Sequence, residues 1–237
     1  MRELETLDDR AIIRTLEVLR NRVAERFPTR GITRIASHLL DLSRITATET
    51  NDLERPYWGM RLVPLLAIAG ALVAFGVLYG LFRVILDQEV GLAEFTQGLE
   101  ATLNIILIAG IAIGFFLRLE NRSKRTVALN GLYRLRAVSH VIDMHQLTKD
   151  PAAVVGTHPT SSSPLRDLDQ EQLARYLDYC TEMLSLIGKL AALYAQHFPD
   201  ATVVAAAHDV EQLTTNLSGK IWQKIMIIQQ TTALSAH

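Results

Sequence analysis

The chain has 237 residues, of which 49% are hydrophobic, and its formal net charge at pH 7 is −1. A mean hydropathy of +0.17 is high for a soluble protein in which 21% of the residues are charged. The first 56 residues contain ten arginines and no lysine, but acidic residues are mixed among them, which argues against the unmixed basic tail of a nucleic-acid-binding protein.

The first predicted elements are two amphipathic helices within residues 1–56, a cytoplasmic helical arm. Thr6 with Asp9 three residues later resembles a capping box, and Pro28 and Gly31 separate the two helices. The polar stretch "TATETND" then predicts a linker towards the membrane. Such arginine-rich helices either lie on anionic lipid or pack against other cytoplasmic helices, and we expect the packing. Their apolar stripes are Ile12, Leu16, Leu19, Val23 and Phe27, and then Ile32, Ile35, Leu39 and Leu42.

Two apolar stretches predict a transmembrane hairpin over residues 57–118. Residues 62–82, "LVPLLAIAGALVAFGVLYGLF", contain no charged side chain over 21 positions, and about 20 such residues cross a bilayer core of about 30 Å. Residues 101–117, "ATLNIILIAGIAIGFFL", number 17 and reach the lower limit for a span; the alternative is a buried core helix. Nothing before Tyr57 resembles the apolar core of a signal peptide, so we expect the first span to remain in the mature protein.

The basic residues beside these stretches predict the orientation of the hairpin. Arg55 and Arg61 precede the first span, and a basic run from Arg118 to Arg125 follows the second. The short connector, residues 87–100, contains four acidic residues and neither lysine nor arginine. Because lysine and arginine near span ends stay on the cytoplasmic side, both termini are expected in the cytoplasm.

Each predicted span carries a pair of glycines four residues apart, Gly76 with Gly80 and Gly110 with Gly114. Small residues at this spacing let helices approach closely where lipid supplies no hydrophobic driving force. The two pairs either hold the spans of one chain together or join copies of the chain, and self-association is the prediction that we carry forward.

After the second span, the pattern predicts an unbroken stalk helix over residues 119–150, which ends in "SHVIDMHQLTKDP". Its core face is marked by Leu135, Val138 and Ile142. His140 and His145 point in different directions at about 100° per residue, so they do not predict a shared metal ion. The hypothesis is instead a polar cluster that senses pH, since histidine titrates near neutrality. In this cluster Asp143 orients His140, and His145 is a separate histidine buried in the core. Its members are Arg136, His140, Asp143 and His145.

Residues 151–164 are predicted to be a linker, because they contain three prolines and a run of serines. The following helix begins either at Ser163 and Pro164 or at Asp169, with Gln172 completing a capping box.

Residues 165–237 predict an antiparallel pair of helices, separated at Phe198 and Pro199, with Asp200 as the N-cap of the second. Cys180 is the only cysteine, so no intramolecular disulfide can form, and its place on the apolar seam indicates a small buried side chain rather than a nucleophile. The seam of the first helix has the heptad spacing Leu173, Leu177, Cys180, Leu184, Ile187, Ala191 and Tyr194, and that of the second consists of Val203, Val210, Leu213, Leu217, Ile221, Ile225 and Ile228.

Three segments after the second span, "SHVIDMHQLTKDP", "RYLDYCTEMLSLIGKLAALYAQ" and "LSGKIWQKIMII", resemble those of uncharacterised bacterial two-span membrane proteins. The resemblance implies a place in the bacterial inner membrane, and it transfers no activity or catalytic residue. The layout is also similar to that of two-span effector domains of bacterial conflict systems, which are thought to perturb membranes; this similarity is one of architecture alone.

The predicted fold is all-α: a two-helix transmembrane hairpin with N-terminal amphipathic helices and a C-terminal cytoplasmic helical bundle. The sequence has no phosphate-binding glycine loop, paired CxxC, HExxH or GxSxG, so no catalytic residue, cofactor or metal site is predicted. Three classes of function remain possible from the sequence. They are a homo-oligomeric scaffold or sensor that engages the lipid bilayer and a cytoplasmic protein, a homo-oligomeric ion channel with Thr102 and Asn104 near its pore, and a membrane-bound enzyme. Nucleic acid is not an expected partner.

Overall fold

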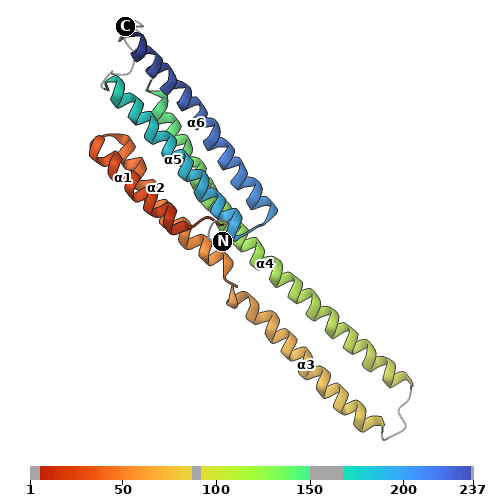
Figure 1. The fold of residues 1–237 in the computed structure, drawn as a ribbon. Coiled ribbons are helices and arrows are strands. Elements are labelled where there is room, and N and C mark those ends of the chain that lie inside the picture. The colour runs from red at the N-terminus through yellow and green to blue at the C-terminus, as the bar shows by residue number, and fades with distance from the viewer. Residues whose placement is uncertain (1–5, 87–91, 150–167, 236–237) are drawn as a thin grey trace. The chain divides into compact units, whose positions relative to one another are not determined.

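The computed structural model describes residues 6–86, 92–149 and 168–235, and the six elements in these residues are all α-helices (Figure 1). The all-α prediction is therefore confirmed for the described part of the chain. The helices divide into two compact units. The bundle unit contains the described residues up to Glu54 and from Arg125 onward, and the two-helix unit contains Arg55–Lys124.

The bundle unit begins with α1 (Asp9–Arg26) and α2 (Gly31–Glu54). The N-cap of α1 is Asp8, whose carboxylate accepts a hydrogen bond from the backbone N–H of Arg10 at 3.0 Å, so the predicted cap at Thr6 is wrong by two residues. The apolar stripes are confirmed, because all nine predicted positions are buried: Ile12, Leu16, Leu19, Val23, Phe27, Ile32, Ile35, Leu39 and Leu42.

Helix α2 continues through the stretch that was predicted to be a polar linker. Residues 46–52 are helical, and Thr46, Ala47 and Thr50 are buried. The Thr50 hydroxyl donates to the backbone carbonyl of Thr46 at 2.9 Å, and the Ser43 hydroxyl donates to that of Leu40 at 2.7 Å. Because short hydroxyl side chains can satisfy themselves within the helix, a polar composition here does not require exposure to water.

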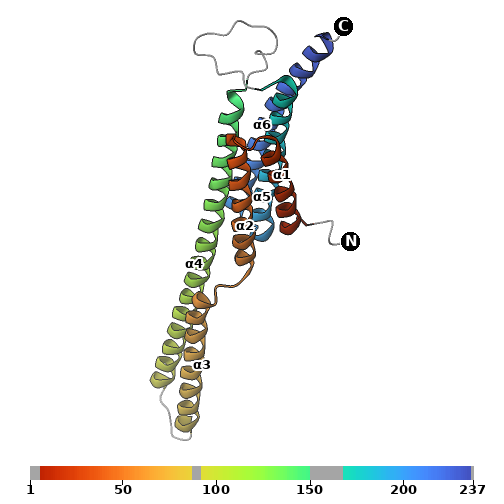
Figure 2. The ribbon, with the colours of Figure 1, turned by 90° about the vertical axis from the view of Figure 1, so that its left-hand side faces the viewer.

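The N-terminal helices pack against α5 (Gln170–His197), in agreement with the packing interpretation of the arm (Figure 2). The ring of Phe27 meets those of Tyr176 and Tyr179 edge to face, with centroids 5.6 and 6.2 Å apart. The guanidinium of Arg22 lies 5.2 Å from the centroid of the Tyr179 ring and pairs with Glu182 at 3.0 Å. The arm is therefore part of the bundle core.

Helices α5 and α6 (Ala201–Ser235) lie side by side and antiparallel (Figures 1 and 2). Of the two predicted starts of α5, the structure has the capping box of Asp169 and Gln172. All seven predicted seam residues of α5 are buried, and Phe198 ends the helix.

Asp200 joins α6 to α4 (Leu92–Leu147). Its carboxylate accepts from the backbone N–H of Thr202 at 3.0 Å, as predicted for an N-cap, and from two guanidinium nitrogens of Arg125 at 3.0 and 2.6 Å. The Arg125 hydrogen bonds are the largest cause that lowers the pKa of Asp200. Of the predicted α6 seam, Leu213 is half-buried and the other six residues are buried.

Helix α4 runs without interruption for 56 residues and ends at Leu147, three residues before the predicted end of the stalk helix. Within the bundle unit, Leu135, Val138 and Ile142 are buried on its core face. The predicted linker at residues 151–164 and part of the predicted outer connector lie outside the described residues.

The two-helix unit consists of α3 (Trp58–Leu86) and the first part of α4. Among the described residues, α4 contains the one stretch that is long and apolar enough to cross a membrane, and none of that stretch is buried. In α3, which has 29 residues, the described apolar stretch Pro64–Val73 is too short to cross a membrane, so the first predicted span is not confirmed.

Candidate functional site

The four predicted glycines lie on the surface of the two-helix unit. Gly76 and Gly80 of α3 and Gly110 and Gly114 of α4 are all exposed. A Cβ built on any of them would meet no atom of the described residues within 4 Å. Among the described residues, no atom of the neighbouring helix therefore packs closely on these glycines.

The side chains between α3 and α4 leave an apolar groove of about 420 Å³. Phe75 lines it from α3, and Ile105 and Ile113 line it from α4, with Gly110 at its border. Its lining contains no charged residue. This groove has no chemical group that could act on a substrate.

A buried carboxylate joins the start of α3 to α4. The Glu120 side chain is 3% exposed and accepts from Arg61 Nε at 2.8 Å, from Lys124 Nζ at 3.2 Å and from the Tyr57 backbone N–H at 3.2 Å. The hydrogen bond from Arg61 is the largest cause that lowers the pKa of Glu120 to about 2. Lys124 Nζ also donates to the backbone carbonyl of Arg55 at 2.8 Å. Sequence reasoning missed this cluster, although Glu120 is the one acid in the basic run after the second span.

The predicted pH-sensing cluster does not form as one group in the structure. Arg136 and His140 are exposed and make no hydrogen bond or ion pair with the residues that the structure describes. Asp143 accepts from Gln146 Nε2 at 2.6 Å instead of orienting His140. His145 is half-buried, and its ring lies against Gly31 of α2. The four residues diverge because they point to solvent, to the next turn and to a neighbouring helix.

The polar contact that holds this end of α4 involves Gln146 and Lys224. Gln146 is 2% exposed, and Lys224 Nζ of α6 donates to its side-chain oxygen at 2.7 Å and to its backbone carbonyl at 3.1 Å. An ammonium near the C-terminus of a helix also interacts favourably with the helix dipole. This pair anchors α4 to α6, and no sequence spacing indicated it.

A second polar group, of which only the tyrosine is fully buried, connects α2, α4 and α5. The Tyr194 hydroxyl donates to Glu49 at 2.5 Å, and Arg134 Nη2 donates to both carboxylate oxygens of Glu49 at 2.6 Å. Tyr194 is fully buried, and burial is the largest cause that raises its pKa. The phenol therefore stays protonated at neutral pH, and the group is suited to holding three helices together rather than to acid–base catalysis.

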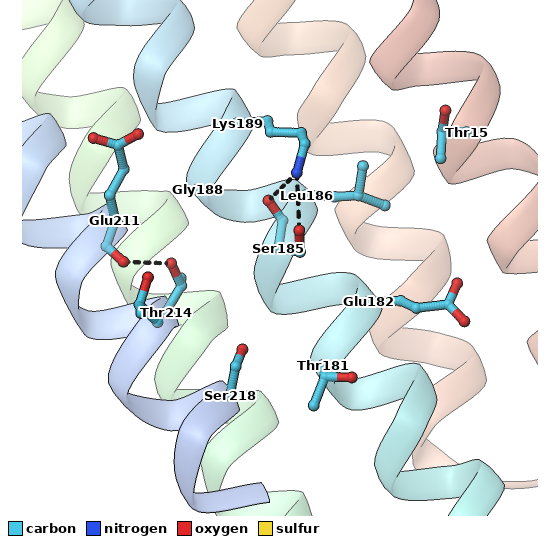
Figure 3. A pocket seen from close by; sticks show the side chains of 11 residues that line it. Thr15, Thr181, Glu182, Ser185, Leu186, Gly188, Lys189, Glu211, Thr214 and Ser218 are labelled. Atoms are coloured by element: carbon cyan, nitrogen blue, oxygen red, sulfur yellow. Dashed lines mark hydrogen bonds between the residues drawn. The ribbon is translucent and has the colours of Figure 1, made fainter. Parts of the chain in front are cut away.

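A polar groove of about 710 Å³ lies along α5 and α6, with Thr15 of α1 at one side (Figure 3). Lys189 Nζ donates to the Ser185 hydroxyl at 2.9 Å, and the Thr214 hydroxyl donates to the backbone carbonyl of Glu211 at 2.9 Å. The hydroxyl groups of Ser185 and Thr214 therefore already have hydrogen-bond partners within the protein.

Cys180 is 1% exposed, and burial raises its pKa to about 12, so the thiol stays protonated at neutral pH and is not suited to attack a substrate. Within residues 6–86, 92–149 and 168–235, no group of three or more His, Cys, Asp or Glu side chains is placed to hold a metal ion.

No protein-family model, curated protein or solved structure matches the chain. Function is therefore inferred from the geometry and chemistry of the chain itself.

Proposed function

We propose that the chain is an integral protein of the bacterial inner membrane, in which α3 and α4 form a two-span hairpin and both termini lie in the cytoplasm. It acts as a homo-oligomeric scaffold or sensor, and its cytoplasmic helices engage a protein partner.

The observation that carries this proposal is the apolar surface of the two-helix unit. Large aliphatic side chains point outward along both helices: Leu66 is 63% exposed, Leu72 is 67% exposed, Ile108 is 67% exposed and Ile111 is 64% exposed. Soluble monomers rarely expose contiguous apolar patches larger than a few hundred Å². Lipid is the environment in which such a surface has no cost.

The length of α3 supports a second span beside that of α4. Its 29 residues correspond to about 44 Å at a rise of about 1.5 Å per residue, more than the bilayer core of about 30 Å. Residues 62–82 of this helix contain no charged residue, and Trp58, 70% exposed, is suited to the interface at its start.

The exposed glycines support self-association. Since Gly76, Gly80, Gly110 and Gly114 have open space around them, a helix of another copy can approach each pair closely. The homo-oligomer is therefore the arrangement that would use these surfaces.

An ion channel is the second candidate, and Asn104 is the observation that favours it. Its polar side chain is exposed on α4 within the apolar stretch, where it would face a pore or a neighbouring helix in an oligomer. The groove inside one hairpin is apolar, so a conducting path would have to form between copies. Electrical recording from purified protein in planar bilayers separates a channel from a scaffold.

The mass of the full-length protein in detergent, measured by light scattering at several concentrations, tests the proposal. We expect a wild-type oligomer that dissociates towards monomer in Gly110→Leu, because a branched side chain keeps the neighbouring backbone away. Gly98→Leu, the same change on α4 outside the predicted span, should keep the wild-type mass. A wild-type protein that is monomeric at every concentration would contradict both the scaffold and the channel.

A further inference from the structure

Helix α4 has a second apolar face in the bundle unit, in addition to the one in the core. Leu135, Val138 and Ile142 are buried. On the other side of the helix, Tyr133 is 60% exposed and Met144 is 67% exposed. A surface helix normally presents polar residues on the side that faces away from its core. The exposed face is therefore suited to contact another apolar surface.

The residues of this face have a regular spacing. We call it the α4 stripe, and it consists of Tyr133, Ala137, His140, Met144 and Leu147, which are separated by four, three, four and three residues and are all exposed. This is the a/d spacing with which one helix packs along another in a coiled coil. The α4 stripe thus has the geometry for a helical partner that runs along α4, rather than for a small ligand.

The membrane indicates which helix that partner is. Helix α4 is unbroken from Leu92 to Leu147, so the α4 stripe belongs to the same helix as the proposed second span. Two copies inserted in one bilayer carry their second spans in the same direction. Both α4 stripes then follow the second span at the same distance along the chain, and association within the membrane gives them a high effective concentration.

The residues beside the α4 stripe permit this pairing. In a parallel pair, the position before each a residue lies near the position five residues later on the partner. Arg136 would then lie near Val141 of the other copy, and Asp143 near Thr148, so no like charges face each other at these positions. His140 would occupy a core position, where a polar side chain favours one register at some cost in stability.

We infer that the α4 stripe is an interface for a second copy of this chain, which packs its own α4 stripe against it in parallel and in register. The inference rests on the proposed function, because it requires that copies of the chain share a membrane.

Cysteine cross-linking of the full-length protein in native membranes tests the inference. Native Cys180 is 1% exposed and should form no disulfide between chains, so the wild-type protein is the background control. Met144→Cys places a thiol on the α4 stripe, and Met226→Cys is the matched control on α6, where the methionine is 40% exposed. On mild oxidation, we expect at least about fivefold more covalent dimer from Met144→Cys, because a disulfide needs Cα atoms about 4.4–6.8 Å apart.

A scan of single cysteines through residues 133–147 adds a readout of geometry. We expect the dimer yield to peak at the five positions of the α4 stripe, Tyr133, Ala137, His140, Met144 and Leu147, and to fall between them. Even yields along the helix would indicate random collision and would overturn the inference.

Two failures can be told apart. If light scattering shows an oligomer but Met144→Cys gives no more dimer than Met226→Cys, the α4 stripe is not the interface and the proposed function stands. The same result is expected if another protein covers the stripe, and it counts against the inference. If the wild-type chain is monomeric, the proposed homo-oligomer fails with it. Circular dichroism that matches wild type shows that each variant is folded.

Discussion

The missing side chain at Gly131 determines how closely α4 and α5 approach. A Cβ at this position would overlap the hydroxyl group and ring of Tyr194, and Tyr194 is fully buried, so it has no room to move aside. The same tyrosine donates to Glu49, which pairs with Arg134. One glycine thus permits a hydrogen-bonded group that joins three helices.

We predict that Gly131→Ala destabilises the bundle, although alanine favours helix formation by up to about 1 kcal/mol. Overpacking in a well-packed core typically costs about 1–3 kcal/mol, which exceeds that gain. Gly219→Ala on α6 is the matched control, because its Cβ would meet no described atom within 4 Å; it should be neutral or stabilising. Thermal unfolding followed by circular dichroism measures both, and a higher Tm for Gly131→Ala would contradict this packing.

The buried thiol of Cys180 predicts a loss of stability in alkali. Its pKa is about 12 in the folded chain, against a usual value of 9.0, with burial as the largest cause. Below pH 9 the thiol is protonated in both the folded and the unfolded chain, so its contribution to the free energy of unfolding is fully present. As the pH rises above 9, the unfolded chain releases a proton that the folded chain keeps, and the free energy of unfolding falls.

We therefore expect the urea midpoint of wild type to decrease from about pH 9 upward, and Cys180→Ala to delay that decrease. In the variant, the loss should begin nearer pH 10, where the unfolded form of Tyr194 starts to ionise, because the pKa of Tyr194 is also raised in the fold. Midpoints measured from pH 8 to pH 11 decide this. Equal slopes for the two proteins between pH 9 and pH 10 would show that Cys180 does not contribute.

At the scale of elements, Glu120 connects the first residues of α3 to α4. Its carboxylate receives the Tyr57 backbone N–H as well as the side chains of Arg61 and Lys124. Since the pKa of Glu120 is lowered from 4.5 to about 2, the connection is at full strength above pH 4.5 and weakens as the pH falls towards 2.

We predict that Glu120→Ala releases the start of α3. The Tyr57 amide should exchange with deuterium at least about tenfold faster, because hydrogen bonds to charged groups typically contribute about 1.5–3 kcal/mol. Hydrogen–deuterium exchange with peptide-level mass spectrometry measures this, and Glu25→Ala on the exposed side of α1 is the control. Unchanged exchange at Tyr57 would show that α3 is held in another way.

For the whole molecule, the proposed topology makes a direct prediction. Reporter fusions after His237 and after Glu54 should be active on the cytoplasmic side, and a fusion within residues 87–100 should be active on the other side, because the basic residues flank the hairpin and the connector is acidic. If the connector fusion reports the cytoplasm as well, the two-span hairpin is wrong.

The sequence by itself determined the helices and their buried faces. The stripe from Ile12 to Phe27, the seam from Leu173 to Tyr194 and the unbroken α4 are all observed, because hydrophobic periodicity is local and a face of this kind is buried whichever helix covers it. The prediction from composition failed at residues 46–52: Thr50 is buried in α2, since its hydroxyl donates to a backbone carbonyl of the same helix.

Only the tertiary structure decided which polar groups meet. Glu120 and Arg61 are separated by 59 residues, and Arg134 and Glu49 by 85 residues, so nothing in their spacing distinguishes them from other acids and bases of the chain. Asp143 lies three residues from both His140 and Gln146, so the sequence allows a hydrogen bond to either. In the structure it accepts from Gln146, whose side-chain oxygen also accepts from Lys224. Such pairs depend on the rotation of each helix, which is set by the packing of all the apolar faces at once, whereas the faces themselves depend only on neighbouring residues.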